Sequence, residues 1–213
     1  MSLSLFVSFE GGEGSGKTTQ ADMLEQRLQL EGIYPVRVHE PGTTPLGKYL
    51  RQWLKRENRR DETISHGAEI LLFAAARAEL VAKIIRPALE RREGAVIADR
   101  FADSTMAYQG YGRRIRLETV RVVNSLATQD LTPDVTFLLD CAPEEGLNRV
   151  GSIQIRLPLD QRLDASRMDD EGTRRFEEES LEFHQRVRQG YLTMARKEPD
   201  RWCVIDATKP VEE

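Results

Sequence analysis

Short apolar runs alternate with longer segments of helical periodicity along the whole chain. The apolar runs predict strands at Leu3–Phe9, Pro35–His39, Ala95–Ala98, Val135–Leu139 and Trp202–Ile205. The segments between them predict helices at Thr18–Leu30, Leu46–Lys55, Ser65–Arg92, Leu117–Thr128, Glu144–Val150 and Arg175–Lys197. Regular alternation of strands and helices is typical of a parallel sheet with helices on both faces. The pattern therefore predicts an α/β fold with a five-stranded parallel sheet, and 213 residues suit a single domain.

Polar residues gather where the predicted strands end. Glu40 follows the second strand and Asp99 the third, while Asp140 and Asp206 follow the last two. In open parallel sheets, ligands bind outside the carboxyl ends of the strands. These side chains should therefore line one crevice, next to the glycine-rich loop that follows the first strand.

That glycine-rich loop carries the strongest chemical signal. Residues 11–18, GGEGSGKT, match G-x-x-x-x-G-K-[ST] at every fixed position, between a predicted strand and a predicted helix. Glycines let successive N–H groups point at phosphate oxygens, and the helix N-terminus adds further donors. Lys17 should reach the outer phosphates, and Thr18 should help to hold Mg²⁺. An ordinary strand-to-helix turn is the alternative, but the complete match in this context favours binding of a nucleoside triphosphate.

Composition excludes several classes of function. A net charge of −4 argues against binding of a nucleic acid polymer through bulk charge. The first apolar run is too short to span a membrane and follows no basic segment, so neither a signal peptide nor a membrane span is expected. Cys141 and Cys203 predict two buried free thiols, which fits a cytoplasmic enzyme. The three histidines lack metal-ligand spacing and are interpreted as structural or surface residues.

One segment, Gly151–Thr173, departs from the regular pattern. It contains Arg156, Arg162 and Arg167, two adjacent aspartates and few apolar residues. A solvated surface loop and a flexible lid that closes its arginines over phosphates fit this composition equally well.

Two further clusters narrow the kind of phosphate-loop protein. The chain has no N-K-x-D of the kind that a GTPase uses to read guanine, and its third strand ends in Asp99-Arg100-Phe101 where a GTPase requires D-x-x-G. This pair suits Mg²⁺ beside a cation that grips phosphate. Phe73 and Arg77 lie four residues apart on one helix face, where they could stack on a base and bond its carbonyl edge. Taken alone, that second pair is also explained by a core phenylalanine and a surface arginine.

Together these motifs resemble those of bacterial-type thymidylate kinases, over about Leu5–Thr208. The matching segments are Glu10–Thr19, Glu40–Thr44, Leu72–Arg77, Asp99–Phe101, Tyr108–Gly110, Leu181–His184, Gly190–Tyr191 and Ile205–Thr208. The resemblance implies a P-loop nucleoside monophosphate kinase fold with a mobile lid at about 151–174. It also implies transfer of the γ-phosphoryl group of ATP, with Mg²⁺, to dTMP to give dTDP.

The resemblance assigns roles to individual residues. On the ATP side it implies binding by Gly11, Gly12, Glu13, Gly14, Ser15, Gly16, Lys17, Thr18, Thr19, Arg149 and Asp206. On the dTMP side it implies binding by Glu13, Glu40, Phe73, Arg77, Arg100, Tyr108 and Gln109. Among these, Glu13 would bind the 3′-hydroxyl group, Phe73 would stack on thymine, and Arg77 would bond its carbonyl edge. Gln109 would approach the base, Tyr108 would disfavour ribonucleotides, and Arg100 would clamp the monophosphate with Asp99 near Mg²⁺.

The resemblance also indicates where catalytic charge should come from. Human-type and yeast-type members carry an arginine in the phosphate loop, where this chain has Gly14. Lys17, Arg100 and the lid should then supply the charge, with Glu13 beside them and Arg156, Arg162 and Arg167 all candidates. The chain reads Arg174-Arg175-Phe176-Glu177 where the family usually has Asp-Arg-[Phe/Ile]-Glu, which leaves the choice among them open.

Two other functions stay open on the sequence alone. One is a different nucleoside monophosphate kinase of the same fold, and the other is a phosphate-loop regulatory module that binds ATP without an acceptor. The expected partners are dTMP and ATP, with no nucleic acid polymer and no membrane. The resemblance further implies a homodimer that pairs through long helices, with the helix at Ser65–Arg92 as a plausible contact.

Overall fold

The sheet is five-stranded and parallel, as the alternation predicts. The computed structural model describes residues 4–56, 64–91, 94–156, 176 and 179–210. Its strands are β1 (Leu5–Gly11), β2 (Val36–His39), β3 (Ala95–Asp99), β4 (Val135–Asp140) and β5 (Trp202–Asp206). They lie in the order β2-β3-β1-β4-β5, and every neighbouring pair is parallel. All the carboxyl ends therefore lie along one edge, and the predicted polar residues Glu40, Asp99, Asp140 and Asp206 are distributed along it.

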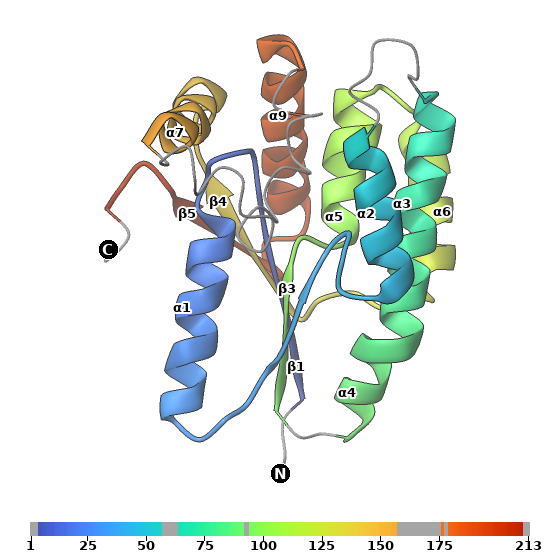
Figure 1. Cartoon of the computed structure of the whole chain (residues 1–213), viewed down its shortest axis with the longest axis vertical. Helices are drawn as coiled ribbons and strands as arrows, with labels where there is room; N and C mark the ends of the chain where they lie inside the picture. The colour runs from blue at the N-terminus through green and yellow to red at the C-terminus, as the bar shows by residue number, and fades with distance from the viewer. Residues whose placement is uncertain (1–3, 57–63, 92–93, 157–175, 177–178, 211–213) are drawn as a thin grey trace.

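Helices cover both faces of this sheet. They are α1 (Lys17–Leu30), α2 (Pro45–Arg56), α3 (His66–Leu80), α4 (Arg86–Arg91), α5 (Ala102–Thr105), α6 (Leu117–Thr128), α7 (Pro143–Arg156) and α9 (Leu181–Lys197). Two π-helical segments, η1 (Val81–Ile85) and η2 (Met106–Gly112), continue α3 and α5. Helix α1 lies on one side of the sheet, whereas α3, α5 and α6 lie on the other (Figure 1).

The alternation of side chains along β1 divides the core between these layers. Val7 and Phe9 pack with Ala21 of α1, whereas Phe6 packs with Leu80 and Ile85 of α3 and η1. Successive side chains of a strand point to opposite faces, so one apolar run fills two cores. A third cluster joins η2 and α9 to the sheet and contains Tyr108, Phe183 and Tyr191.

One helical prediction needs correction, and one helical stretch is absent from the predictions. The predicted helix Ser65–Arg92 is interrupted by the π-helical turn η1, and Ser65 itself is the N-cap, since its Oγ accepts the Ala68 N–H at 3.2 Å. The helical stretch of α5 and η2 is not predicted, because its polar residues and two glycines have low helix propensity. Burial of Met106, Ala107 and Tyr108 in the core overrides that propensity.

Other boundaries and burial predictions also differ in detail. The described helix near the C-terminus begins at Leu181, with Ser180 as its N-cap, and α7 continues through Arg156 into the predicted lid segment. Both cysteines are free, but Cys203 is exposed because β5 is an edge strand. Within the described residues, no helix is both long and apolar enough to cross a bilayer.

Candidate active site

Two positions of the phosphate loop require glycine, one of them both for its backbone conformation and for lack of space. Gly14 and Gly16 have φ values of 65° and 88°, in the left-handed region that favours glycine. A Cβ at position 14 would also collide with the carbonyl oxygen of Gly146 on α7. The loop therefore has no room for a side chain at position 14, so this position supplies no cation to the site.

Lys17 begins α1 and folds back over the loop. Its Nζ donates to the Gly12 carbonyl at 2.6 Å and to Ser15 Oγ at 3.3 Å. Burial, followed by the positive charge of Arg100, lowers the pKa of Lys17 to about 8. The ammonium group is thus held at the loop, without a dedicated carboxylate partner among the described residues.

Thr18 and Asp99 meet at the carboxyl edge of the sheet. Thr18 Oγ1 donates to Asp99 Oδ2 at 2.6 Å, and Arg37 Nη2 lies 3.7 Å from the same carboxylate oxygen. A hydroxyl and a carboxylate are hard oxygen ligands of the kind that Mg²⁺ prefers, and Mg²⁺ usually keeps several waters beside one or two protein ligands. The two residues fit the predicted magnesium site.

Arg100 connects the phosphate loop to the helical layer. Its backbone has a φ of 68°, which is uncommon for a residue other than glycine and typical of functional turns. Arg100 Nη2 donates to Glu13 Oε1 at 3.0 Å, and Tyr108 Oη donates to the same oxygen at 2.6 Å. Burial alone would raise the pKa of Glu13, but Arg100 and Lys17 outweigh it and lower that pKa. Glu13 is therefore held as a carboxylate.

Glu10 supports the turn at Arg100 from within the core. This fully buried side chain accepts the Phe101 N–H at 2.8 Å, Ser104 Oγ at 2.6 Å and Tyr191 Oη at 3.0 Å. Burial, and secondarily the charge of Asp103, raises the pKa of Glu10 to about 7. Sequence reasoning gave Glu10 no role, although its position at the end of an apolar strand is an available signal of a buried polar contact.

Arg77 lies in the core beside Glu40. Its Nε and Nη2 donate to the Glu40 carboxylate, Nη1 donates to Thr105 and Asn124, and Nη2 also donates to the Phe101 carbonyl. All five N–H donors of the guanidinium therefore have acceptors within the protein. The interpretation of this residue as a surface arginine is wrong, since its side chain is 1% exposed.

Phe73 lies on α3 one turn before Arg77, and Gln109 lies on η2, which a hydrogen bond joins to α3. The half-buried Phe73 ring packs against Phe176, with 6.2 Å between centroids, and Phe176 in turn contacts the Tyr108 ring at 5.0 Å. Gln109 Nε2 donates to Glu69 Oε1 at 2.9 Å. Phe73, Tyr108 and Gln109, which sequence reasoning placed around the acceptor, thus belong to one region of the fold.

Arg149 and Asp206 are also close together, at the other end of the phosphate loop. Arg149 Nη1 donates to the Ala207 carbonyl at 2.8 Å, and Asp206 accepts from the N–H and hydroxyl of Thr208. The Thr208 hydrogen bonds lower the pKa of Asp206. Helix α7 and the loop after β5 are therefore tied together where the sequence predicts the ATP side.

Comparison with known proteins identifies the family. The model of the thymidylate kinase family matches residues 9–213. This chain belongs to the thymidylate kinase family. It is 45% identical to the thymidylate kinase of Desulfovibrio desulfuricans over 98% of this chain and 90% of that protein. It is 46% identical to the enzyme of Synechococcus sp., over 95% of this chain and 87% of that protein.

A solved structure agrees with this assignment. The crystal structure of thymidylate kinase from Ehrlichia chaffeensis superimposes with a TM-score of 0.70 at 34% identity, covering 95% of this chain and 92% of that one. Thymidylate kinases transfer a phosphoryl group from ATP to dTMP, so the predicted fold, reaction, enzyme class and phosphoryl donor are confirmed.

In this thymidylate kinase, four charged residues beside the predicted site were not singled out from the sequence. They are Glu10, Glu69, Arg113 and Arg37, and the partners they contact are distant in sequence. The predicted lid cations Arg162 and Arg167 lie outside the described residues, as does the side chain of Arg156. Their roles stay predictions.

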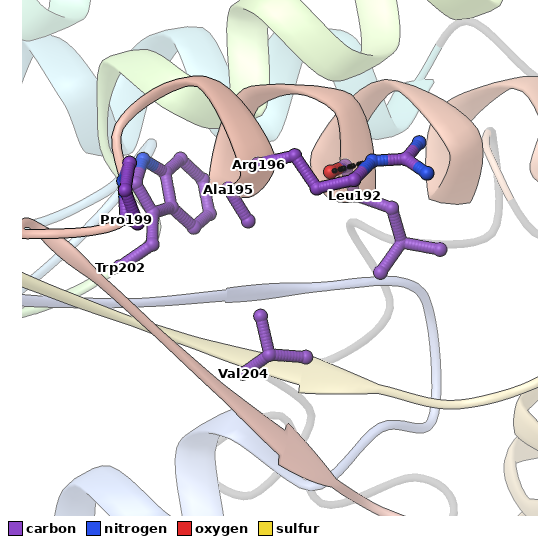
Figure 2. A pocket seen from close by; sticks show the side chains of 6 residues that line it. All are labelled: Leu192, Ala195, Arg196, Pro199, Trp202 and Val204. Atoms are coloured by element: carbon purple, nitrogen blue, oxygen red, sulfur yellow. Dashed lines mark hydrogen bonds between the residues drawn. The ribbon is translucent and has the colours of Figure 1, made fainter.

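A separate apolar hollow lies away from this site, between α9 and β5. Leu192, Ala195, Arg196, Pro199, Trp202 and Val204 line it (Figure 2). None of these residues is among those predicted to bind a nucleotide, and Arg196 is the one charged side chain among the six.

Proposed function

We propose that the phosphate loop and the residues around Arg100 form a single site, in which the γ-phosphoryl group of ATP passes to the phosphate of dTMP. The contact that carries this proposal is the 3.0 Å ion pair between Glu13 and Arg100. Glu13 belongs to the loop that receives ATP, whereas Arg100 opens the helical segment of the acceptor side. Tyr108 bonds to both residues, so donor and acceptor sides share one charged network.

Positive charge and positioning carry the chemistry. The transition state of phosphoryl transfer is loose and spreads negative charge over the phosphoryl oxygens. Lys17 exchanges its contact with the Gly12 carbonyl for the outer phosphates of ATP. Arg100, whose backbone conformation aims it across the phosphate loop, binds the phosphate of dTMP. Fixed cations of this kind stabilise developing charge without reorganisation during the reaction.

Thr18 and Asp99 hold Mg²⁺ in this proposal. When bound there, the ion would supply positive charge that neutralises part of the negative charge of the ATP phosphates. The 2.6 Å contact between the two side chains supports this assignment, because it places a hydroxyl and a carboxylate together beside the loop.

The acceptor nucleoside lies along α3 and η2. Phe73 offers an aromatic face that is only half-buried, and Gln109 lies across from it on η2. In this proposal the Tyr108 phenol, which donates to Glu13 at 2.6 Å, lies on the sugar side and disfavours ribonucleotides. Arg77 holds Glu40 against α3. Because all its N–H groups already donate within the protein, a hydrogen bond from Arg77 to thymine requires one of these N–H groups to be shared between two acceptors.

A second copy of this chain pairs with the helical face formed by α3 and α6. Large apolar side chains are exposed there, with Leu71 at 61%, Val122 at 69% and Leu126 at 81%. Adjacent exposed apolar residues mark a surface that is covered by a partner. A cytoplasmic location is supported by the two free cysteines.

A coupled assay with dTMP, dUMP, dCMP and AMP as acceptors tests the acceptor site. We expect dTMP to have the highest kcat/KM of the four. AMP turnover as fast as dTMP turnover would refute the arrangement of Phe73, Tyr108 and Gln109 around a pyrimidine deoxynucleotide.

A further inference from the structure

Two hydrogen bonds join the helices of the acceptor side on either side of Phe73. Glu69, Phe73 and Arg77 recur every four residues on α3 and so lie along one face of the helix. Arg77 Nη1 donates to Thr105 Oγ1 at 2.9 Å, and Gln109 Nε2 donates to Glu69 Oε1 at 2.9 Å. The Gln109 amide is therefore held one helical turn from the ring that is proposed to stack on the base.

The partner of Gln109 decides which way its amide points. Glu69 is fully buried and forms an ion pair with Arg113, whose Nε lies 3.2 Å from Glu69 Oε1. A carboxylate in an ion pair only accepts hydrogen bonds, so the amide nitrogen of Gln109 must face it. The amide nitrogen and oxygen diverge from one carbon atom. The carbonyl oxygen is consequently turned away from Glu69, and the amide cannot flip without placing two acceptors against each other.

We infer that Glu69 is a positioning residue, which presents the Gln109 carbonyl oxygen to the acceptor base and so selects pyrimidines that carry a hydrogen on N3. This inference rests on the proposed location of Gln109 beside the base. Thymine and uracil have an N3–H that donates to such an oxygen. Cytosine has an unprotonated N3, which places an acceptor against an acceptor. A site built around a specific hydrogen bond discriminates strongly against an analogue that leaves its polar group unpaired.

A matched control exists within the same cluster. Arg113 forms an ion pair with Glu179 as well as with Glu69, and its guanidinium lies 4.9 Å from the centre of the Phe183 ring. Glu179→Gln removes a carboxylate from Arg113 but leaves the bond between Glu69 and Gln109 in place. This variant therefore tests whether the ion pairs of Arg113 act only on stability, because it does not disturb the orientation of the Gln109 amide.

The experiment compares kcat/KM for dTMP, dUMP and dCMP in the wild type and in the variants Glu69→Gln, Glu69→Asp, Glu179→Gln and Gln109→Leu. For each variant, the kcat/KM values of two substrates are measured on the same preparation and divided. A variant that is only partly folded lowers both values equally, so their ratio is unaffected. We expect Glu69→Gln to lower the dTMP to dCMP ratio by about tenfold or more, since its amide lets Gln109 flip. Glu69→Asp, whose shorter side chain withdraws from Gln109, should act in the same direction. The dTMP to dUMP ratio should not change, because these bases differ only in a methyl group.

The possible outcomes distinguish a failure of the role of Glu69 from a failure of the proposed location of Gln109. In the double variant Glu69→Gln/Gln109→Leu, the dTMP to dCMP ratio should equal that of Gln109→Leu alone, because Glu69 acts through Gln109. An unchanged ratio in both Glu69 variants, while Gln109→Leu lowers it, would overturn the role of Glu69. An unchanged ratio in Gln109→Leu would overturn the proposed position of Gln109 itself. If Glu179→Gln lowered the dTMP to dCMP ratio as much as the Glu69 variants do, the role of Glu69 in orienting Gln109 would be overturned in favour of a purely structural role of these ion pairs.

Discussion

Arg77 on α3 and Glu40 after β2 form an ion pair that is almost completely buried, with side chains 1% and 5% exposed. Burial raises the pKa of Glu40, and the Arg77 guanidinium counteracts that rise. The pair joins the helical layer to the carboxyl edge of the sheet. Its energetic importance lies in the cost of separating the partners, since either charge left alone in the core is unfavourable.

Removal of one partner of this pair should destabilise the fold. We expect Arg77→Met to lower the free energy of unfolding by about 3–5 kcal/mol, as measured by urea denaturation. The double variant Arg77→Met/Glu40→Gln should recover part of this loss, because no isolated charge remains. A single variant as stable as the wild type would contradict the buried ion pair.

The pH dependence of ATP binding should report on Lys17. Burial lowers the pKa of Lys17 to about 8, so the free enzyme loses this charge as the pH rises through that value. ATP binds the protonated form, and its affinity should therefore fall between about pH 8 and pH 10 in calorimetric titrations. In Lys17→Ala, affinity should be weak and level across this range. A wild-type affinity that is independent of pH would exclude contact between Lys17 and the phosphates.

Glu10 should make stability depend on pH in an unusual direction. Its pKa is raised from 4.5 to about 7 in the folded state, so the folded chain binds more protons than the unfolded chain between these values. Stability must then fall as the pH rises through this window. Relative to Glu10→Gln, the wild type should lose about 2 kcal/mol of unfolding free energy between pH 5.5 and pH 8. Parallel curves for the two proteins would mean that Glu10 ionises normally.

Phe73 should contribute to dTMP affinity through its ring. We expect Phe73→Ala to weaken binding of dTMP by about 1–3 kcal/mol, the range for aromatic stacking on single-stranded bases. Phe73→Leu retains apolar volume against Phe176 but loses the aromatic plane, and it should also bind dTMP weakly. If Phe73→Leu bound dTMP as tightly as the wild type, Phe73 would serve only to fill the core. The KM for ATP is the control, and it should be unchanged in both variants.

The oligomeric state can be tested by adding charge to the face of α3 and α6. We expect Leu126→Glu to convert a dimer into a monomer in sedimentation experiments, because burial of an unpaired carboxylate opposes association. Leu30→Glu is the matched control, since Leu30 is 80% exposed and Leu126 81%, yet Leu30 lies on α1 across the sheet. Equal sedimentation of the wild type and Leu126→Glu would rule out this face as the dimer contact.

Periodicity and local motifs determine much of this enzyme. The strand positions, the parallel sheet and the phosphate loop follow from residues that are close in sequence, because alternating burial and glycine geometry are local properties. Thr18 and Asp99 could be placed together on the same basis, since both follow parallel strands at one edge. The helix containing Tyr108 and Gln109 could not, because packing in the core outweighs the low helix propensity of its residues.

The tertiary structure decides which charged side chains act together. Glu10 meets Tyr191, Glu40 meets Arg77, and Glu69 meets Gln109, across 181, 37 and 40 positions of sequence. No local pattern encodes these pairs, because a buried carboxylate is recognised only by the donors that surround it in the fold. The sequence by itself determined the loop, the sheet and the family resemblance. Only the folded structure decided which carboxylates hold Arg100, Arg77 and Gln109 in place, since those contacts depend on distances between elements that are far apart along the chain.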